Sequence, residues 1–235
     1  MKTVVRSEIG LQMSNNQDSF LILEGEFPVY AVADGMGGHR GGHVGSKMAV
    51  EAVKRTLEGH APDESLLSAC FQKANEDIFL RQAQDANLSG MGTTLSVLWE
   101  KADSFLLGHV GDSRCYLLRN GVLSQTSTDH SLVAELLRGG VITEDMAADY
   151  PYRNVITRAV GTDRVVTADI TVLDKKLGDR WLLCSDGLTE YVKAPDLLKF
   201  MGEPHLNAAA DLMVGKALHG GGHDNITFIL MEVDA

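Results

Sequence analysis

Short apolar runs separated by glycine-rich turns recur along this chain and predict a β-rich core. Runs that fit strands lie at residues 19–23, 29–33, 94–99, 104–109, 113–118, 168–173, 180–184 and 225–233. Apolar positions spaced three and four residues apart predict amphipathic helices at 45–57, 64–82, 131–137, 195–201 and 207–218. The strands cluster and do not alternate one by one with helices. The pattern therefore favours an α+β fold over a doubly wound parallel sheet.

No change in composition, internal repeat or proline-rich linker marks a domain boundary in the 235 residues. The apolar fraction of 44% and the charged fraction of 23% are close to globular averages, so the chain can form a substantial core. We expect one domain spanning residues 1–235, with a weakly periodic surface flap at about 132–152.

The charge balance argues against nucleic-acid and membrane partners. Acidic residues outnumber basic ones by 32 to 21, the formal net charge is −11, and no run of five basic residues occurs. Lys2, Arg6 and Glu8 make the first ten residues unlike a signal peptide, and no apolar run is long enough to span a bilayer. Three widely spaced cysteines in apolar surroundings indicate buried, reduced thiols. We expect a soluble cytoplasmic protein.

The most informative pattern is an apolar strand that ends at an aspartate beside a glycine. It occurs at Asp34-Gly35, Gly111-Asp112 and Asp186-Gly187, and Gly222-His223-Asp224 leads directly into the last strand. One such pair usually marks only a turn. Four of them, if the sheets bring them together, would repel one another strongly unless a cation were bound.

Carboxylate ligands select hard ions, so the sequence predicts Mg²⁺ or Mn²⁺ in preference to zinc. Two or more ions sharing Asp34 or Asp186 would suit hydrolysis of a phosphate ester.

Other chemistries fit the sequence poorly. A cysteine-dependent phosphatase needs an arginine six residues after its cysteine, where this chain has Glu76, Gly121 and Glu190. The glycine-rich run at 35–40 ends in Arg40 where a dinucleotide-binding loop needs glycine. His39 and His43 could form a zinc pair, but the glycines between them are poor helix formers.

Eight sequence blocks, in order from end to end, carry a family resemblance. They are Asn16-Gln17-Asp18-Ser19, Ala33-Asp34-Gly35-Met36-Gly37-Gly38-His39, Gly90-Met91-Gly92-Thr93-Thr94, His109-Val110-Gly111-Asp112-Ser113-Arg114, Thr128-Asp129-His130-Ser131, Asn154-Val155-Ile156-Thr157-Arg158-Ala159-Val160-Gly161, Cys184-Ser185-Asp186-Gly187-Leu188 and Gly222-His223-Asp224-Asn225-Ile226-Thr227. With these blocks the chain resembles a metal-dependent protein Ser/Thr phosphatase of the PP2C type, in its compact bacterial form.

The resemblance implies a four-layer α/β/β/α sandwich, in which two central antiparallel sheets are flanked by helices. It implies two Mn²⁺ or Mg²⁺ ions, with a position for a third. Asp34 would bridge two ions, Asp186 and Asp224 would complete one site, and the Gly35 carbonyl would bind the other ion. Asp112 would join Asp186 at the third position.

The resemblance also implies catalytic roles and a reaction. Asp18 would hold a water bound to metal, and a metal-activated water or hydroxide would attack phosphorus without a phosphoenzyme. Asn225 would orient Asp224 or a bound water, or would only cap the strand start. Eukaryotic relatives have a histidine, a proposed proton donor, at the position of Met36, so this chain needs another donor and His39 is a candidate. The alternative is that His39 is a loop histidine that only forms local hydrogen bonds.

One departure concerns the substrate. The family usually has an arginine three residues before the asparagine of the first block, where it clamps phosphate, and this chain has Met13. Arg6 or Arg40 could bind the phosphate from another direction.

The resemblance predicts a phosphatase that acts on phosphoserine and phosphothreonine proteins, opposes a bacterial Ser/Thr kinase and is a monomer. Alternatives are a catalytically weak phosphoprotein-binding regulatory module and a di-metal phosphoesterase for small substrates. In the flap, Met146, Tyr150 and Tyr152 could contact a phosphoprotein or pin the flap to the domain, and the second interpretation is favoured.

Overall fold

The computed structural model describes residues 1–148 and 150–234, without the side chains of residues 38–40 and 148. Two five-stranded antiparallel sheets form its centre. The first sheet has the order β1 (Lys2–Glu8), β12 (Ile226–Glu232), β11 (Arg180–Cys184), β8 (Arg114–Arg119) and β9 (Val122–Gln125). The second has the order β10 (Asp169–Asp174), β7 (Ser104–Val110), β6 (Leu95–Glu100), β3 (Val29–Ala33) and β2 (Ser19–Leu23).

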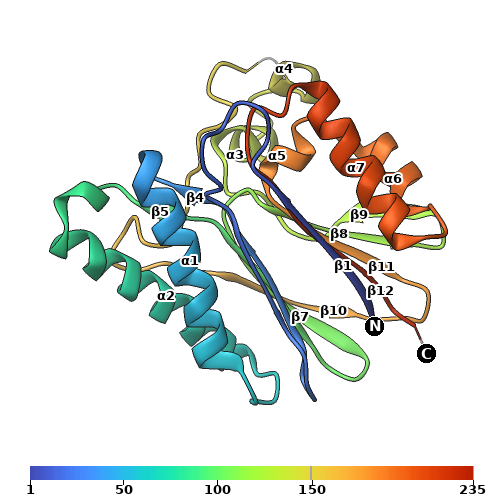
Figure 1. Ribbon diagram of the computed structural model, residues 1–235, viewed down its shortest axis with the longest axis horizontal. Helices are drawn as coiled ribbons and strands as arrows, with labels where there is room; N and C mark the ends of the chain where they lie inside the picture. The colour runs from blue at the N-terminus through green and yellow to red at the C-terminus, as the bar shows by residue number, and fades with distance from the viewer. Residues whose placement is uncertain (149, 235) are drawn as a thin grey trace.

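Helices cover the outer face of each sheet (Figure 1). The long helices α1 (Gly38–Leu57) and α2 (Glu64–Gln84) lie against the second sheet, and the short 3₁₀ turn η1 (Ala86–Leu88) follows them. The helices α5 (Asp186–Thr189), α6 (Ala194–Met201) and α7 (Leu206–Gly220) lie against the first sheet. This arrangement confirms the predicted α+β class and the four-layer sandwich.

Side-chain alternation along the strands builds three apolar layers. On β11, Trp181 and Leu183 face the other sheet, whereas Leu182 and Cys184 face the helices. The Trp181 ring and the Phe105 ring of the second sheet form a T-shaped pair, with ring centroids 5.3 Å apart. Because the central strands are buried on both faces, their sequences are nearly continuous apolar runs with little visible alternation.

Most predicted elements are present to within one or two residues, and the differences have local causes. The edge strands β1 and β9 were missed because their half-exposed sequences are rich in polar residues. The first helix begins at Gly38, seven residues before the predicted start, since glycines lower helix propensity. Gly45 suits this helix because a Cβ there would lie only 2.9 Å from the Gly92 carbonyl oxygen.

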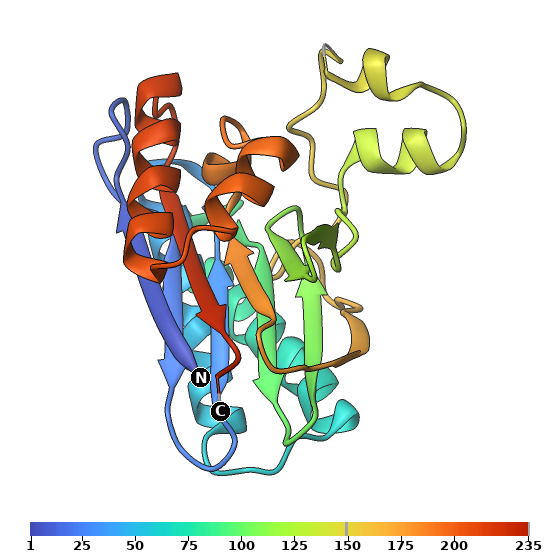
Figure 2. The same ribbon diagram turned by 90° about the vertical axis from the view of Figure 1, so that its right-hand side faces the viewer.

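The predicted flap contains two short helices, α3 (Leu132–Arg138) and α4 (Glu144–Ala148), and projects from the body (Figure 2). Its two ends meet, because the Leu132 N–H donates to the Val155 carbonyl oxygen (2.9 Å) and the Thr157 N–H donates to the His130 carbonyl oxygen (2.8 Å). Met146 is 54% exposed and Tyr152 is 62% exposed. The expectation that Met146, Tyr150 and Tyr152 pin the flap to the domain is therefore wrong for Met146 and Tyr152, whereas Tyr150 is half-buried and its ring lies against that of Tyr152.

Candidate active site

Five aspartates lie at the same end of the two sheets. Asp34 follows β3, Asp112 follows β7, and Asp186 begins α5 two residues after the last residue of β11. Asp18 precedes β2, and Asp224 precedes β12. The antiparallel pairing places them together, since Ser19 pairs with Ala33 and Cys184 pairs with Phe228. The end of one strand thus meets the start of its neighbour.

Burial and mutual repulsion raise the pKa of four of these carboxyl groups. Burial has the largest effect on each, and neighbouring aspartates add to it. The pKa is raised to about 7 for Asp18 and Asp112, to about 6 for Asp186, and well above the usual range for Asp34. Asp224 contributes to the repulsion at Asp18, Asp34 and Asp186. Such a cluster is costly for the folded chain unless positive charge is added.

The cluster fits divalent cations by its chemistry. Oδ1 of Asp186 is buried and has no hydrogen-bond partner, whereas most buried polar atoms have one. The Asp186 carboxyl group also shares a hydrogen bond with Asp34, and this bond partly offsets the rise in the pKa of Asp186. Within the described residues, no three Asp, Glu, His or Cys side chains already form a group that could hold a metal ion. The all-oxygen donor set of the five aspartates nevertheless matches Mg²⁺ or Mn²⁺.

Two threonines hold the backbone of Asp34. The Asp34 N–H donates to Oγ1 of Thr94 (2.9 Å), and its carbonyl oxygen accepts from Oγ1 of Thr93 and from the N–H of Thr94, both at 2.8 Å. Thr93 belongs to the small ribbon that β4 (Gly35–Met36) forms with β5 (Gly92–Thr93). The sequence places both threonines in a family block but indicates no role for them. Their role in holding Asp34 is visible only once β4 is seen to pair with β5.

Gly35 occupies a position that no larger residue could take. A Cβ there would lie 2.6 Å from the Gln17 carbonyl oxygen and would overlap the Gly42 carbonyl. The absence of a side chain therefore lets the segment after Asp34 pack against α1 and the Gln17 loop.

The Asp112 loop is fixed by His130, which sequence reasoning also left without a role. Nδ1 of His130 accepts from the Gly111 N–H (3.0 Å), so Nε2 carries the proton and donates to Asp169 (3.0 Å). His130 is buried and lies at the entry to the flap. The histidine thereby connects the loop of one predicted metal ligand with the base of the flap.

Asn225 uses its amide to hold the loop that precedes β2. Its Nδ2 donates to the carbonyl oxygens of Ile9 (2.8 Å) and Asn15 (3.0 Å), and its Oδ1 accepts from the Gln17 N–H (2.7 Å). The Asn225 backbone N–H donates to Oδ1 of Asp224 (2.7 Å). The described contacts therefore position Asp224 through the Asn225 backbone, and the side chain joins the first and last parts of the chain.

Among the residues considered for phosphate binding, Arg6 makes polar contacts that lie away from the carboxylates. Arg6 points to α7, where it pairs with Asp211 at 2.8 Å and contacts Asn207 at 3.2 Å. Met13 is half-buried in the loop before Asp18. The side chains of His39 and Arg40 lie outside the described residues. His43, the other half of the considered zinc pair, lies 3.2 Å from the Asn16 carbonyl oxygen through Nδ1.

The three cysteines are buried and are not in disulfides. Burial raises the pKa of Cys70 and Cys115 to about 12 and raises that of Cys184 as well. A buried thiol with a raised pKa is a poor nucleophile at neutral pH, so the geometry agrees with the exclusion of cysteine chemistry.

Comparison with known proteins agrees with this fold and site. Residues 12–219 match the protein phosphatase 2C family. The serine/threonine phosphatase stp of Listeria monocytogenes is 39% identical over 243 residues, which cover 100% of this chain and 96% of that protein. The chain therefore belongs to the protein phosphatase 2C family.

Solved structures show the same architecture. The crystal structure of the Mycobacterium tuberculosis serine/threonine phosphatase PstP has a TM-score of 0.92 at 34% identity and covers 100% of this chain and 99% of that one. The catalytic domain of PstP in complex with 2 manganese ions has a TM-score of 0.89 at 34% identity, covering 100% and 98% of the two chains. Within the described residues, no helix is long and apolar enough to cross a membrane.

Proposed function

We propose that this protein is a metal-dependent phosphatase that removes phosphate from phosphoserine and phosphothreonine in proteins. The observation that carries the proposal is the cluster of carboxylates at one end of the two sheets, of which Asp18 is buried and the others half-buried, with pKa values raised by desolvation and by one another. Membership of the protein phosphatase 2C family and the names of its relatives support it.

Mn²⁺ or Mg²⁺ ions would be held by Asp34, Asp186, Asp224 and the carbonyl oxygen of Gly35, with Asp112 and Asp186 as ligands of a third position. When bound, two such ions neutralise the carboxylates, orient the phosphate and lower the pKa of water so that it can attack phosphorus. A manganese complex of the related PstP catalytic domain supports the choice of ion.

The residues of the chain contribute by position and by charge. Thr93 and Thr94 fix the backbone of Asp34, and Ser185 donates a hydrogen bond to Oδ2 of Asp18 (2.8 Å). Asp18 would hold a water molecule of the metal site, a role that its place beside Asp186 and Asp224 supports. His39 stays the proposed proton donor to the leaving group.

The wider setting is also proposed. We infer that the substrates are phosphorylated proteins of a cognate Ser/Thr kinase, and that the protein is a single-domain monomer of the cytoplasm. The buried free thiols support a reducing compartment.

Hydrolysis of a phosphothreonine peptide and of an aryl phosphate, each with Mn²⁺ and with EDTA, tests the function. A protein phosphatase releases phosphate from the peptide only with the metal. Preference for the aryl phosphate would favour a small-molecule phosphoesterase. Binding of the peptide without turnover would favour a regulatory module.

A further inference from the structure

A pocket of about 280 Å³ opens beside the carboxylate cluster, between β8, β9 and the segment that joins α5 to α6. Arg114, two residues after Asp112, lies on one side. Thr189 and Lys193 lie on the other side, and Oγ1 of Thr189 donates to the Asp186 carbonyl oxygen (3.2 Å). A group in this pocket would therefore border the proposed catalytic site.

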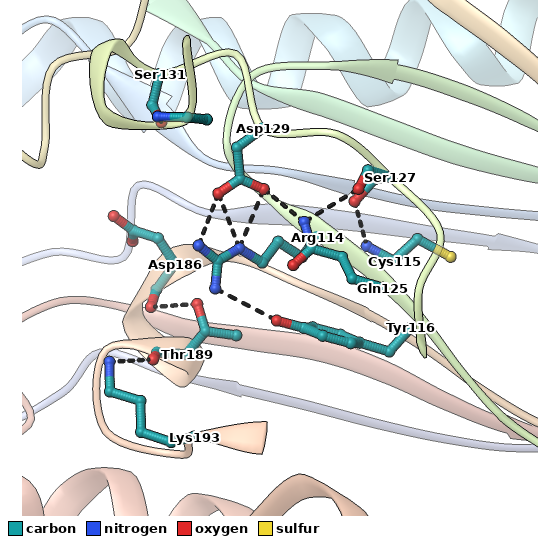
Figure 3. A network of polar contacts seen from close by, with 11 residues as sticks. Arg114, Cys115, Tyr116, Gln125, Ser127, Asp129, Ser131, Asp186, Thr189 and Lys193 are labelled. Atoms are coloured by element: carbon teal, nitrogen blue, oxygen red, sulfur yellow. Dashed lines mark hydrogen bonds and ion pairs between the residues drawn. The ribbon is translucent and has the colours of Figure 1, made fainter. Parts of the chain in front are cut away.

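The Arg114 guanidinium is fixed and already paired (Figure 3). It donates to Asp129 through Nη2 at 2.6 Å and through Nε at 3.0 Å, and to the Tyr116 hydroxyl oxygen at 3.3 Å. Gln125 holds Asp129 from the other side at 2.7 Å. Arg114 therefore gives the pocket a rigid polar wall whose charge is largely balanced.

Lys193 supplies positive charge that is not balanced in this way. Its Nζ donates to the Thr189 carbonyl oxygen (2.9 Å), and within the described part of the chain no carboxylate forms an ion pair with it. Burial, and after it the positive charge of Arg114, lower the pKa of Lys193. The negative charge of Glu190 offsets part of this lowering. An added anion would relieve the repulsion between the two cations.

The other walls select the shape of that anion. Leu123 and Val192 are apolar, and the hydroxyl of Tyr116 and the amide of Gln125 add polar contacts. An apolar stem with a charged end matches this combination, because the stem can pack on Leu123 and Val192 while the end reaches Lys193. A glutamate or a phosphorylated side chain has that form.

We propose that this pocket binds a negatively charged side chain of the phosphoprotein substrate, close in sequence to the phosphoserine or phosphothreonine that is hydrolysed. The chemistry required is an anionic oxygen group, either a carboxylate or a second phosphate. The inference rests on the proposed function and adds a sequence preference to it.

The test measures kcat/KM with Mn²⁺ on phosphothreonine peptides that differ at one residue, scanned along both sides of the phosphothreonine. That residue is glutamine, glutamate, lysine or a non-hydrolysable phosphonate analogue of phosphoserine. We expect the glutamate or phosphonate peptide to exceed the glutamine peptide by about three- to fivefold at one or two positions, the range of a partly exposed ion pair. The Lys193→Glu variant is expected to prefer the lysine peptide at the same positions.

Lys199→Glu is the matched control, since it makes the same charge change in the last turn of α6 and outside the pocket lining. It should keep the wild-type ratio of acidic to neutral peptide. If only the phosphonate peptide is preferred over the glutamine peptide, the anion that the pocket binds is a phosphate. If the glutamate and phosphonate peptides are both preferred, the pocket accepts either a carboxylate or a phosphate. Equal rates on all peptides, or a preference that Lys193→Glu leaves unchanged, would overturn the pocket's role while leaving the phosphatase intact. Hydrolysis of none of the peptides would contradict the proposed function and this inference together.

Discussion

The hydroxyl group of Ser185 donates a 2.8 Å hydrogen bond to Oδ2 of Asp18, a residue 167 positions earlier in the chain. Ser185 follows β11 of the first sheet, and Asp18 precedes β2 of the second. The bond therefore joins the two sheets at the carboxylate end. It also lowers the pKa of a carboxyl group that burial and two neighbouring aspartates raise.

Removal of this donor should weaken catalysis. In Ser185→Ala, Asp18 loses a hydrogen bond to a charged group, which contributes about 1.5–3 kcal/mol. We expect kcat with saturating Mn²⁺ to fall about tenfold to a hundredfold. The acidic limb of the kcat–pH profile should move to higher pH, because Asp18 then binds its proton more tightly. Steady-state kinetics over a range of pH provide the measurement.

Ser104→Ala is the matched control, since Ser104 also donates to an aspartate, Asp103 (3.1 Å), but at the opposite end of β7 from the carboxylates. It should change kcat and the acidic limb much less than Ser185→Ala. Equal effects from both variants would show that the Ser185 bond to Asp18 has no particular role.

Repulsion among the aspartates should make the metal-free protein more stable when one charge is removed. The carboxyl pKa values of about 6 to 7 at Asp18, Asp112 and Asp186 lie above the unfolded value of 3.8. The folded chain then binds protons more tightly than the unfolded chain, so these groups make its stability decrease as pH rises from about 4 to 7. In EDTA at pH 7.5, Asp186→Asn should raise Tm by several degrees, since each kcal/mol is worth about 2–4 °C at this size.

The pH dependence provides the internal control for that experiment. The gain in Tm for Asp186→Asn over wild type should shrink towards pH 4, where the carboxyl groups are protonated in both proteins' folded states. With saturating Mn²⁺ the order should reverse, because the wild type binds the ion more tightly. A gain in Tm that does not vary with pH would contradict the electrostatic explanation.

Local pattern in the sequence predicted the α+β class and the carboxylate end, and the family resemblance added the four-layer sandwich. Each of Asp34, Asp112 and Asp186 lies within two residues of the end of an apolar run, and antiparallel pairing brings such ends together. The roles of Ser185, Thr94 and His130 could not be predicted, because each depends on a contact between segments far apart in the chain. Thr94 bonds Asp34 across 60 residues, and Ser185 bonds Asp18 across 167. A single-domain organisation and the assignment of individual metal ligands stay predictions.

Inhibitor response separates metal chemistry from thiol chemistry. All three cysteines are buried, and burial raises their pKa values. We therefore expect EDTA to abolish phosphate release, and excess Mn²⁺ to restore it. Iodoacetamide should leave the rate nearly unchanged during the assay. Inactivation by iodoacetamide with resistance to EDTA would overturn the proposed chemistry.

Met13 should limit affinity for small phosphate esters. An arginine that clamps phosphate through two charge-assisted hydrogen bonds contributes about 1.5–3 kcal/mol. If position 13 faces the phosphate, Met13→Arg should lower KM on an aryl phosphate about tenfold or more, with a smaller change in kcat. A melting curve of the variant is the control. A lower Tm with no gain in affinity would show instead that the half-buried Met13 packs inward.

Calorimetric titration of Mn²⁺ into the metal-free protein at pH 7 tests the central claim most directly. If the carboxylates at the sheet ends hold the ions, at least two ions should bind per chain. Because the pKa of Asp18 and Asp112 lies at about 7, binding should also release protons, so the observed heat should depend on the ionisation enthalpy of the buffer. Asp186→Asn should weaken binding by at least about tenfold. Binding that releases no protons and is unaffected by Asp186→Asn would contradict the assignment of these carboxylates as the metal centre.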